Sequence, residues 1–401
     1  MAEPKLTICV PVYNGEKTIA TLLKSLTSQT MEDIRILVSD NNSEDNTGKI
    51  CKNMASRDSR IVYSKNPENL GLIFNFAHLF MAHSSPFTAY AAADLVWKPS
   101  MAEKCVQTLE ENPDALVAYP YCQFLDDDKK TDEIYFDKIT FDDPDPSTRF
   151  LNVIKYLGWT TPFLGVMRTF NAAKSYMFTM YLYNEDLAGD NLLLANLALQ
   201  GRILQVPEIL LQRTKDSSQK EKLPHGLLDR YLKIDKMNAS PSGQGIRLPT
   251  INYIHNHCKL IAHSDLSLEE KDKLVKPAIS ALLSRYQGQI HFELQRALKL
   301  ISLAKFRQGW EDDLKEINKE EIDRTRYHHL DFVYVARLIQ EMEFVEALMP
   351  GYPFIHFAKA VLYNALGRNK ETQLALIQQL EHTPAHQPSK DFLSMLTKKV
   401  A

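Results

Sequence analysis

The first 120 residues of the chain alternate between short apolar segments and segments with helical spacing. Leu6 to Val12 is apolar and β-branched, which is typical of a buried strand, whereas apolar residues between Lys17 and Gln29 fall on one face of a helix. The alternation continues with strands expected at 34–39, 61–64 and 87–91 and helices expected at 48–55 and 73–83. Such a βα series predicts a mostly parallel sheet covered by helices, with ligands at the carboxyl ends of the strands.

Strands and helices continue to about residue 206, and helical periodicity dominates the chain after that. A helix is expected at 101–111, a strand at 116–124, a loop with a short hairpin at 126–146, a helix at 191–200 and a strand at 202–206. Strand signals fade beyond Lys215. Because 401 residues exceed what one core usually covers, we expect an α/β domain at 1–220, a helical linker region at 221–300 and an all-α domain at 301–401.

One segment in the last hundred residues resembles a tetratricopeptide unit. It has small, aromatic, turn, apolar and stop residues where such a unit uses them, at Ala360, Tyr363, Gly367, Leu376 and Pro384, although Thr372 replaces the preferred Ala. An ordinary helical hairpin explains the pattern equally well, because stable arrays need about three repeats. We therefore hypothesise that the C-terminal helices bind a protein partner.

Charge and cysteine content argue against several classes of protein. The net charge is −3 and the charged residues are interspersed, so no nucleic-acid partner is expected. No window approaches the roughly 18 apolar residues of a membrane span and no signal-like segment opens the chain, so we expect no membrane span and a cytoplasmic location. The five cysteines are scattered without a CxxC pair, which indicates free thiols.

Polar residues follow the first two expected strands, whose ends should lie on the same edge of the sheet. Tyr13 could lie against a nucleobase, and Asp40 could accept hydrogen bonds from the base. The segment Asp40-Asn41-Asn42-Ser43 is also typical of a simple turn. Both interpretations of Asp40 remain open at this point.

Two further aspartates stand where a diphosphate and an acceptor hydroxyl would need them. Asp94 ends an apolar strand, where a carboxylate could hold a divalent cation that bridges a diphosphate. Asp190 directly precedes an apolar helix, where a carboxylate could remove a proton from a hydroxyl. The alternatives are a capping or turn residue before Pro99 for Asp94 and a helix N-cap for Asp190. Asp126-Asp127-Asp128 is interpreted as a solvated turn.

Taken in order, these segments resemble the family 2 glycosyltransferases of GT-A fold over about residues 5–215. The motifs are Pro11-Val12-Tyr13-Asn14, the DNxSxDxT segment 40–47, 66–71 with Asn75, 94–99, and Asp190 eleven residues before Gly201 and seventeen before Pro207-Glu208. The resemblance implies an α/β fold, with a GT-A (Rossmann-like), mostly parallel sheet domain followed by an all-α C-terminal region.

The resemblance also implies an activity and roles for individual residues. It implies inverting transfer of a sugar from a nucleoside diphosphate donor, such as a UDP-sugar, to a hydroxyl of a glycan or protein. Asp190 would be the catalytic base, and Asp94 would bind a metal and the diphosphate. The donor would contact Pro11, Tyr13, Asn14, Glu16, Asp40, Asn69, Asn75, Ala93 and Asp94. The acceptor groove would include Trp159, Thr161, Gly165 and Arg168.

Two departures from the family's pattern concern the expected divalent cation, Mn²⁺ or Mg²⁺. The first position of the DxD motif is Ala92, and the residue that often supplies a His ligand is Lys215, two residues after Arg213. Either Asp94 and the diphosphate hold the cation weakly, or Lys215 supplies part of the positive charge. A non-catalytic nucleotide-sugar-binding scaffold is the alternative function. A nicotinamide-dependent dehydrogenase is disfavoured, because no GxGxxG follows the first strand.

Overall fold

The computed structural model describes residues 3–125, 133–158, 160–182, 189–214, 249–306, 339, 342–343, 346, 355–365 and 368–398. The chain forms two compact units, Met1–Leu227 with Asn256–Ala278 and Leu228–His255 with Ile279–Ala401. This division differs from the three consecutive parts expected from the sequence, because residues 256–278 return to the first unit. His257 illustrates the return, since its ring packs edge-on against Phe150 with the ring centroids 6.1 Å apart.

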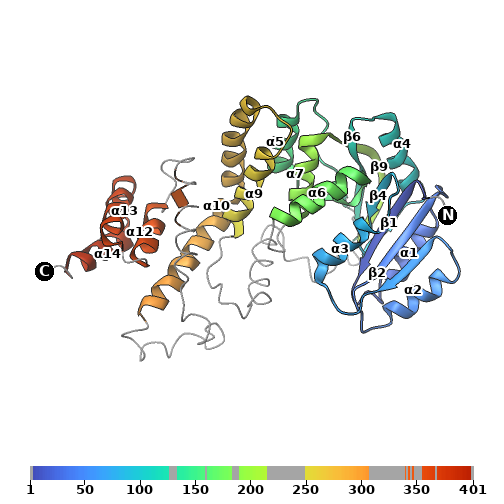
Figure 1. The fold of residues 1–401 in the computed structure, drawn as a ribbon, viewed down its shortest axis with the longest axis horizontal. Helices are drawn as coiled ribbons and strands as arrows, with labels where there is room; N and C mark the ends of the chain where they lie inside the picture. Colours follow the sequence, from blue (N-terminus) through green and yellow to red (C-terminus); the bar gives the residue numbers. More distant parts are fainter. Residues whose placement is uncertain are drawn as a thin grey trace. The chain divides into compact units, whose positions relative to one another are not determined.

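The first unit contains a nine-stranded mixed sheet with the strand order β3-β2-β1-β4-β8-β6-β9-β5, and β7 pairs with β6 (Figure 1). The strands β1 to β4 run parallel, and β6 runs parallel to β9. The short strands β5, β7 and β8 run antiparallel to their neighbours. The bounds are Leu6–Val12 (β1), Ile34–Asp40 (β2), Ile61–Lys65 (β3), Phe87–Tyr90 (β4), Leu95–Trp97 (β5), Ala115–Leu125 (β6), Glu133–Tyr135 (β7), Val166–Arg168 (β8) and Arg202–Thr214 (β9).

The helices predicted at 48–55, 73–83, 101–111 and 191–200 and in the segment 17–29 are all present, within a few residues of their expected bounds. The elements α5, η1, α6, β5 and β8 were not predicted. The helices and the 3₁₀ helix η1 have the bounds Ile19–Thr27 (α1), Thr47–Ala55 (α2), Gly71–Met81 (α3), Met101–Glu111 (α4), Pro146–Tyr156 (α5), Thr161–Leu164 (η1), Thr169–Leu182 (α6), Gly189–Gln200 (α7), Pro249–Ala262 (α9) and Leu268–Phe306 (α10).

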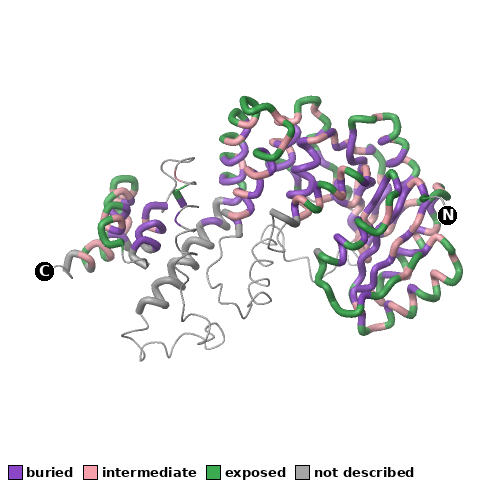
Figure 2. Tube along the Cα trace, in the orientation of Figure 1, coloured by how far each residue is buried: buried purple, intermediate pink, exposed green. Residues whose placement is uncertain are grey.

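The strand β1 in the interior of the sheet is buried on both faces. All seven residues of β1 are buried, as a parallel strand between two helical layers requires (Figure 2). Successive residues of a strand point to opposite faces. Ser39 of β2 contacts Asn75 of α3, whereas the next residue, Asp40, approaches Gly48 of α2. The helices α2 and α3 therefore cover opposite faces of the sheet.

The second unit includes three C-terminal helices, Ile355–Ala365 (α12), Asn369–His382 (α13) and Gln387–Lys398 (α14). Helix α12 packs on α13, and α13 packs on α14. Ala360, Thr372 and Leu376 are buried between them, and Pro384 follows the end of α13. Helices are thus present in the C-terminal region, while their assignment to a tetratricopeptide-like repeat stays a prediction.

Several sequence predictions concern residues outside the described ranges. They are the turn Asp126-Asp127-Asp128, Trp159, Lys215 and Gly367. Within the described ranges, none of the helices combines the length and the apolar character that crossing a membrane would require.

Candidate active site

The loops that follow the parallel strands meet at one edge of the sheet. Val12 at the end of β1 pairs with Asp40 at the end of β2, and Asp40 pairs with Lys65 at the end of β3. Because these strands are parallel and in register, the residues after each of them emerge side by side. Pro11 lies within β1 and is buried. The other predicted donor contacts lie in these loops or close to them.

Hydrogen bonds join the loop after β1 to the loop after β2. Three successive backbone N–H groups, those of Asn14, Gly15 and Glu16, donate to the side-chain oxygens of Ser43, Thr47 and Asp45 at 2.9, 2.8 and 3.0 Å. The Glu16 carboxylate in turn accepts a hydrogen bond from the backbone N–H of Asn46 at 3.1 Å. Tyr13 remains 48% exposed in the same loop. These hydrogen bonds hold the loop in place while the Tyr13 ring stays accessible to a ligand.

Asp40 is completely buried. Its Oδ1 accepts the backbone N–H of Ser43 at 2.8 Å, and its Oδ2 accepts the hydroxyl of Tyr63 at 2.7 Å. Burial raises the pKa of Tyr63, and the hydrogen bond to the Asp40 carboxylate raises it further. The Asp40 side chain therefore shapes the turn after β2, while its contact with a nucleobase stays a prediction.

A network of side-chain amides holds the loop after β3. The amide of Asn41 donates to Oδ1 of Asn69 at 2.7 Å, and the amide of Asn66 donates to Oδ1 of Asn41 at 3.1 Å and to Oδ1 of Asn75 at 3.0 Å. Asn75 is 2% exposed and also bonds Ser39. The predicted residues Asn69 and Asn75 are thus joined through Asn41 and Asn66. These two linking residues stand in the matched motifs, although the sequence did not indicate their role.

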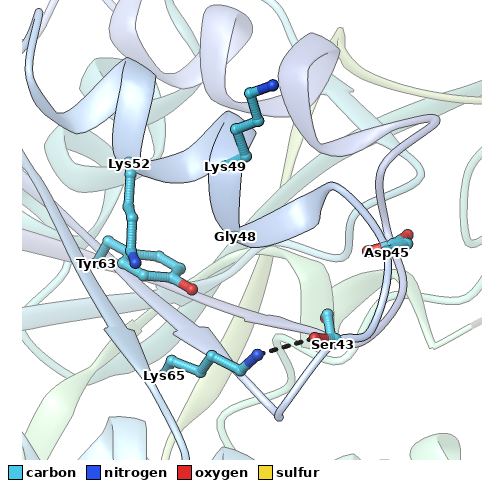
Figure 3. Close-up of a pocket in the computed structure, with 7 residues that line it drawn as sticks. All are labelled: Ser43, Asp45, Gly48, Lys49, Lys52, Tyr63 and Lys65. Carbon is cyan, nitrogen blue, oxygen red and sulfur yellow. Dashed lines mark hydrogen bonds between the residues drawn. The ribbon is translucent and has the colours of Figure 1, made fainter.

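A cavity of about 410 Å³ lies beside the turn after β2, lined by Ser43, Asp45, Gly48, Lys49, Lys52, Tyr63 and Lys65 (Figure 3). Lys65 donates to the backbone carbonyl of Ser43 at 2.9 Å across its rim. None of the residues predicted to bind the donor lines this cavity. Its position therefore does not mark the predicted donor site.

Asp94 forms an ion pair that the sequence did not indicate. Its Oδ2 lies 2.8 Å from Nε of Arg213, and the two side chains are 37% and 29% exposed. The antiparallel pairing of β5 with β9 sets Leu95 opposite Arg213, which places the two charges together. Ala93 lies near the loop after β1, because a Cβ added to Gly15 would be 3.8 Å from the Ala93 Cβ.

Asp190 lies in the first turn of α7. The helix begins at Gly189, so Asp190 is within the helix and is not the residue before it, and its Oδ1 accepts the N–H of Asn191 at 2.9 Å. Burial raises the pKa of Tyr90, and the negative charges of Asp94 and Asp190 raise it further, while the positive charge of Arg213 opposes them. Asp94 and Asp190 therefore both lie within electrostatic reach of one half-buried tyrosine at the end of β4.

The predicted acceptor residues fall into two groups. Thr161 begins η1 and is 3% exposed, and Phe163 of the same turn lies 5.0 Å from the Tyr90 ring, between centroids. Gly165 instead fits against β6, because an added Cβ would lie 2.4 Å from the Ala118 carbonyl oxygen. Gly165 thus has a packing role, and its contact with an acceptor stays a prediction.

Arg168 has a structural role, while its contact with an acceptor stays a prediction. Its guanidinium donates to the backbone carbonyls of Leu109, Asn112 and Ala115 at 2.7, 3.4 and 2.8 Å. These carbonyls lie at the end of α4 and the start of β6, where the turn would otherwise leave them without a helical partner. Arg168 therefore ties β8 to this turn.

The described residues around Asp94 offer fewer ligands than a divalent cation prefers. Mn²⁺ and Mg²⁺ prefer several oxygen ligands, whereas Asp94 is already paired with Arg213 and Ala92 offers no ligand. Within the residues that the structure describes, no three His, Cys, Asp or Glu side chains are grouped to hold a metal. A divalent cation at Asp94 stays a prediction.

Comparison with known proteins agrees with this architecture. The family model described as Glycosyl transferase family 2 matches residues 7–168. The glycosyltransferase GlyA of Streptococcus pneumoniae is 40% identical over 72 residues, which are 18% of this chain and 10% of GlyA. The GalNAc(5)-diNAcBac-PP-undecaprenol beta-1,3-glucosyltransferase of Campylobacter jejuni is 38% identical over 63 residues, 16% of this chain and 20% of that enzyme. The chain thus matches a fifth or less of the length of these two relatives.

A solved structure extends the similarity over most of the chain. TarS 1-349 of S. aureus, in complex with UDP-GlcNAc, aligns with 92% of this chain and 91% of its own at a TM-score of 0.55 and 17% identity. At this identity the similarity concerns the fold alone. The family match, the strand order of the sheet and the shared fold agree: residues 7–168 are similar to the family 2 glycosyltransferases, and the sheet domain has a GT-A fold.

Proposed function

We propose that this chain transfers a sugar from a nucleoside diphosphate donor, a UDP-sugar, to a hydroxyl of a glycan or protein acceptor, with inversion at the anomeric carbon. The observation that carries the proposal is the similarity of residues 7–168 to the family 2 glycosyltransferases, and the charges of Asp94 and Asp190, which both raise the pKa of Tyr90, support it. A displacement reaction needs a base for the acceptor hydroxyl and a binding site for the departing diphosphate. Asp190 and the Asp94 region are the candidates for these two tasks.

The donor is proposed to lie across the ends of β1, β2 and β4. Tyr13 is exposed for stacking on a base. The backbone hydrogen bonds of Asn14 and Glu16 hold the loop around it in place. Asp40, Asn69 and Asn75 maintain the loops after β2 and β3. A uridine donor is supported by the complexes of TarS, which shares the fold, with UDP and with UDP-GlcNAc.

The proposed reaction is a single displacement. The acceptor oxygen attacks the anomeric carbon from the face opposite the diphosphate, and its proton passes to the Asp190 carboxylate. The bond between the anomeric carbon and the phosphate oxygen breaks, and its electron pair leaves with UDP. Attack from the opposite face inverts the configuration. The general base contributes about 10²- to 10⁴-fold to such a reaction.

The test is turnover of a panel of nucleotide sugars by the wild type and by Asp190→Asn. We expect the variant to lose about 10²- to 10⁴-fold in kcat while its Kd for UDP changes little, because the amide keeps the shape but removes the base. Asp145→Asn is the matched control, since Asp145 also lies at a helix start, where it accepts the N–H of Thr148 at 2.8 Å. Equal turnover by Asp190→Asn and the wild type would remove Asp190 from the role of base.

Wild-type binding of UDP without turnover of any donor would favour the non-catalytic scaffold. We propose that the acceptor contacts are Trp159, Thr161, Gly165 and Arg168. We further propose that the C-terminal helices α12, α13 and α14 bind a protein partner and that the reaction takes place in the cytoplasm.

A further inference from the structure

Arg213 places a fixed positive charge where the resemblance implies a metal ion. Its Nε lies 2.8 Å from Oδ2 of Asp94, and 29% of the Arg213 side chain is exposed. A small ligand can therefore reach the guanidinium without displacing core residues. Strand pairing also fixes the position of Arg213, because Leu95 pairs with Arg213 and Val96 pairs with Gln212.

The guanidinium has unused donors of the right kind. An arginine side chain has five N–H donors, and Asp94 receives the one at Nε. Within the described part of the chain, the two Nη groups of Arg213 donate to no protein acceptor. Parallel N–H donors of a guanidinium match the spacing of phosphate oxygens, and such charge-assisted bonds are stronger than neutral ones. The free side of Arg213 is thus suited to a diphosphate.

The positive charge of Arg213 also acts on Tyr90 at the end of β4. It acts on Tyr90 in the direction opposite to Asp94 and Asp190, so all three charged groups lie around this tyrosine. Ala92 supplies no second carboxylate, and a cation held at Asp94 would share the single carboxylate with the guanidinium. The arrangement favours a cation that belongs to the protein over one recruited from solution.

We propose that Arg213, paired with Asp94, binds the diphosphate of the donor and neutralises the departing nucleotide in place of a divalent cation. This inference rests on the proposed function, because it needs a nucleoside diphosphate donor. Breaking the bond between the sugar and the phosphate leaves negative charge on the UDP oxygen, and the nearby guanidinium stabilises that charge. UDP itself is the probe that can test the inference.

The experiment measures UDP binding to the full chain by calorimetry, once with EDTA and once with Mn²⁺, for the wild type, Arg213→Met and Arg213→Lys. We expect the wild type to bind UDP equally well in both conditions. Arg213→Met should bind about 10- to 100-fold more weakly, because a charge-assisted hydrogen bond to the ligand is lost. Arg213→Lys should lie between them, since it keeps the charge but not the paired donors.

Arg202→Met is the matched control. Arg202 lies at the opposite end of the same strand, β9, and forms a comparable ion pair with Asp114 at 2.6 Å. This control should bind UDP like the wild type. Thermal unfolding of both methionine variants checks that they are folded.

The possible results separate the two levels of the proposal. UDP binding to the wild type that requires Mn²⁺, or unchanged binding to Arg213→Met, overturns the inference but leaves the proposed function intact. Metal-independent binding together with a loss specific to Arg213 supports it. If UDP fails to bind the wild type in either condition, the proposed function fails and this inference fails with it.

Discussion

His83 is a half-buried histidine whose surroundings favour the neutral ring. Its Nε2 lies 3.3 Å from Oγ1 of Thr88 and 3.8 Å from Sγ of Cys9, while its buried Nδ1 contacts no polar atom within the described part of the chain. Burial lowers the pKa of His83 to about 4, with a partly opposing influence from Glu3. The histidine of an unfolded chain has a pKa of about 6.5.

We expect acid to destabilise the first unit through His83. The unfolded chain takes up a proton as the pH falls below about 6.5 and the folded chain does not until about 4, so stability is lost across this window. His83→Gln should reduce the difference in unfolding free energy between pH 7 and pH 5 by up to about 2 kcal/mol. Urea denaturation at the two pH values measures this difference.

His263→Gln provides the control for this prediction. His263 belongs to the same unit but is exposed, so its removal should leave the pH dependence of stability unchanged. An identical pH dependence in the wild type and His83→Gln would contradict the assignment of the effect to His83.

At the scale of secondary structure elements, Gly165 sets how closely η1 and β8 approach β6. A Cβ at this position would lie 2.4 Å from the carbonyl oxygen of Ala118 and 2.7 Å from the Cβ of Tyr119. Neither atom can move away without shifting the strand. Gly165→Ala should therefore destabilise the first unit by about 1–3 kcal/mol, as overpacking in a core does.

Gly189→Ala is the comparison for that variant. Gly189 begins α7, and no atom of the residues that the structure describes lies within 4 Å of a Cβ added there. Alanine should be neutral or slightly stabilising there, because it restricts the unfolded chain. Midpoints of urea unfolding for the two variants test the prediction, and equal midpoints would count against the close approach at Gly165.

The elements themselves were predictable where they are long and periodic. β1 and β2 each have seven residues with apolar, β-branched sequences, and α4 buries one face of eleven residues. β5 and β8 have only three residues each, which is too few for any periodicity. Their pairing partners β9 and β4, distant in sequence, make them strands.

At the scale of the whole molecule, all five cysteines belong to the first unit. Four are buried and Cys258 is partly buried, and all are free thiols, as the sequence predicted. Burial raises the pKa of each, to about 12. The reactive thiolate is therefore scarce in the folded protein at neutral pH.

Thiol labelling should therefore report unfolding of the first unit alone. We expect slow reaction of all five thiols with a disulfide reagent at pH 8 and rapid, complete reaction in denaturant. Partial unfolding confined to the second unit should leave the labelling rate unchanged. Mass spectrometry of the labelled chain gives the count, and rapid native labelling of any of the four buried thiols would contradict the prediction.

The sequence by itself determined the βα order of the first unit, the free cysteines and the three aspartates that mark the candidate site. It could do so because strand and helix periods are local and the motifs are contiguous. The tertiary structure alone decided which residues meet. Asp94 pairs with Arg213 through strand pairing, Gly165 and Arg168 pack against β6 and α4, and residues 256–278 join the first unit. These contacts join distant parts of the chain, so no local pattern encodes them.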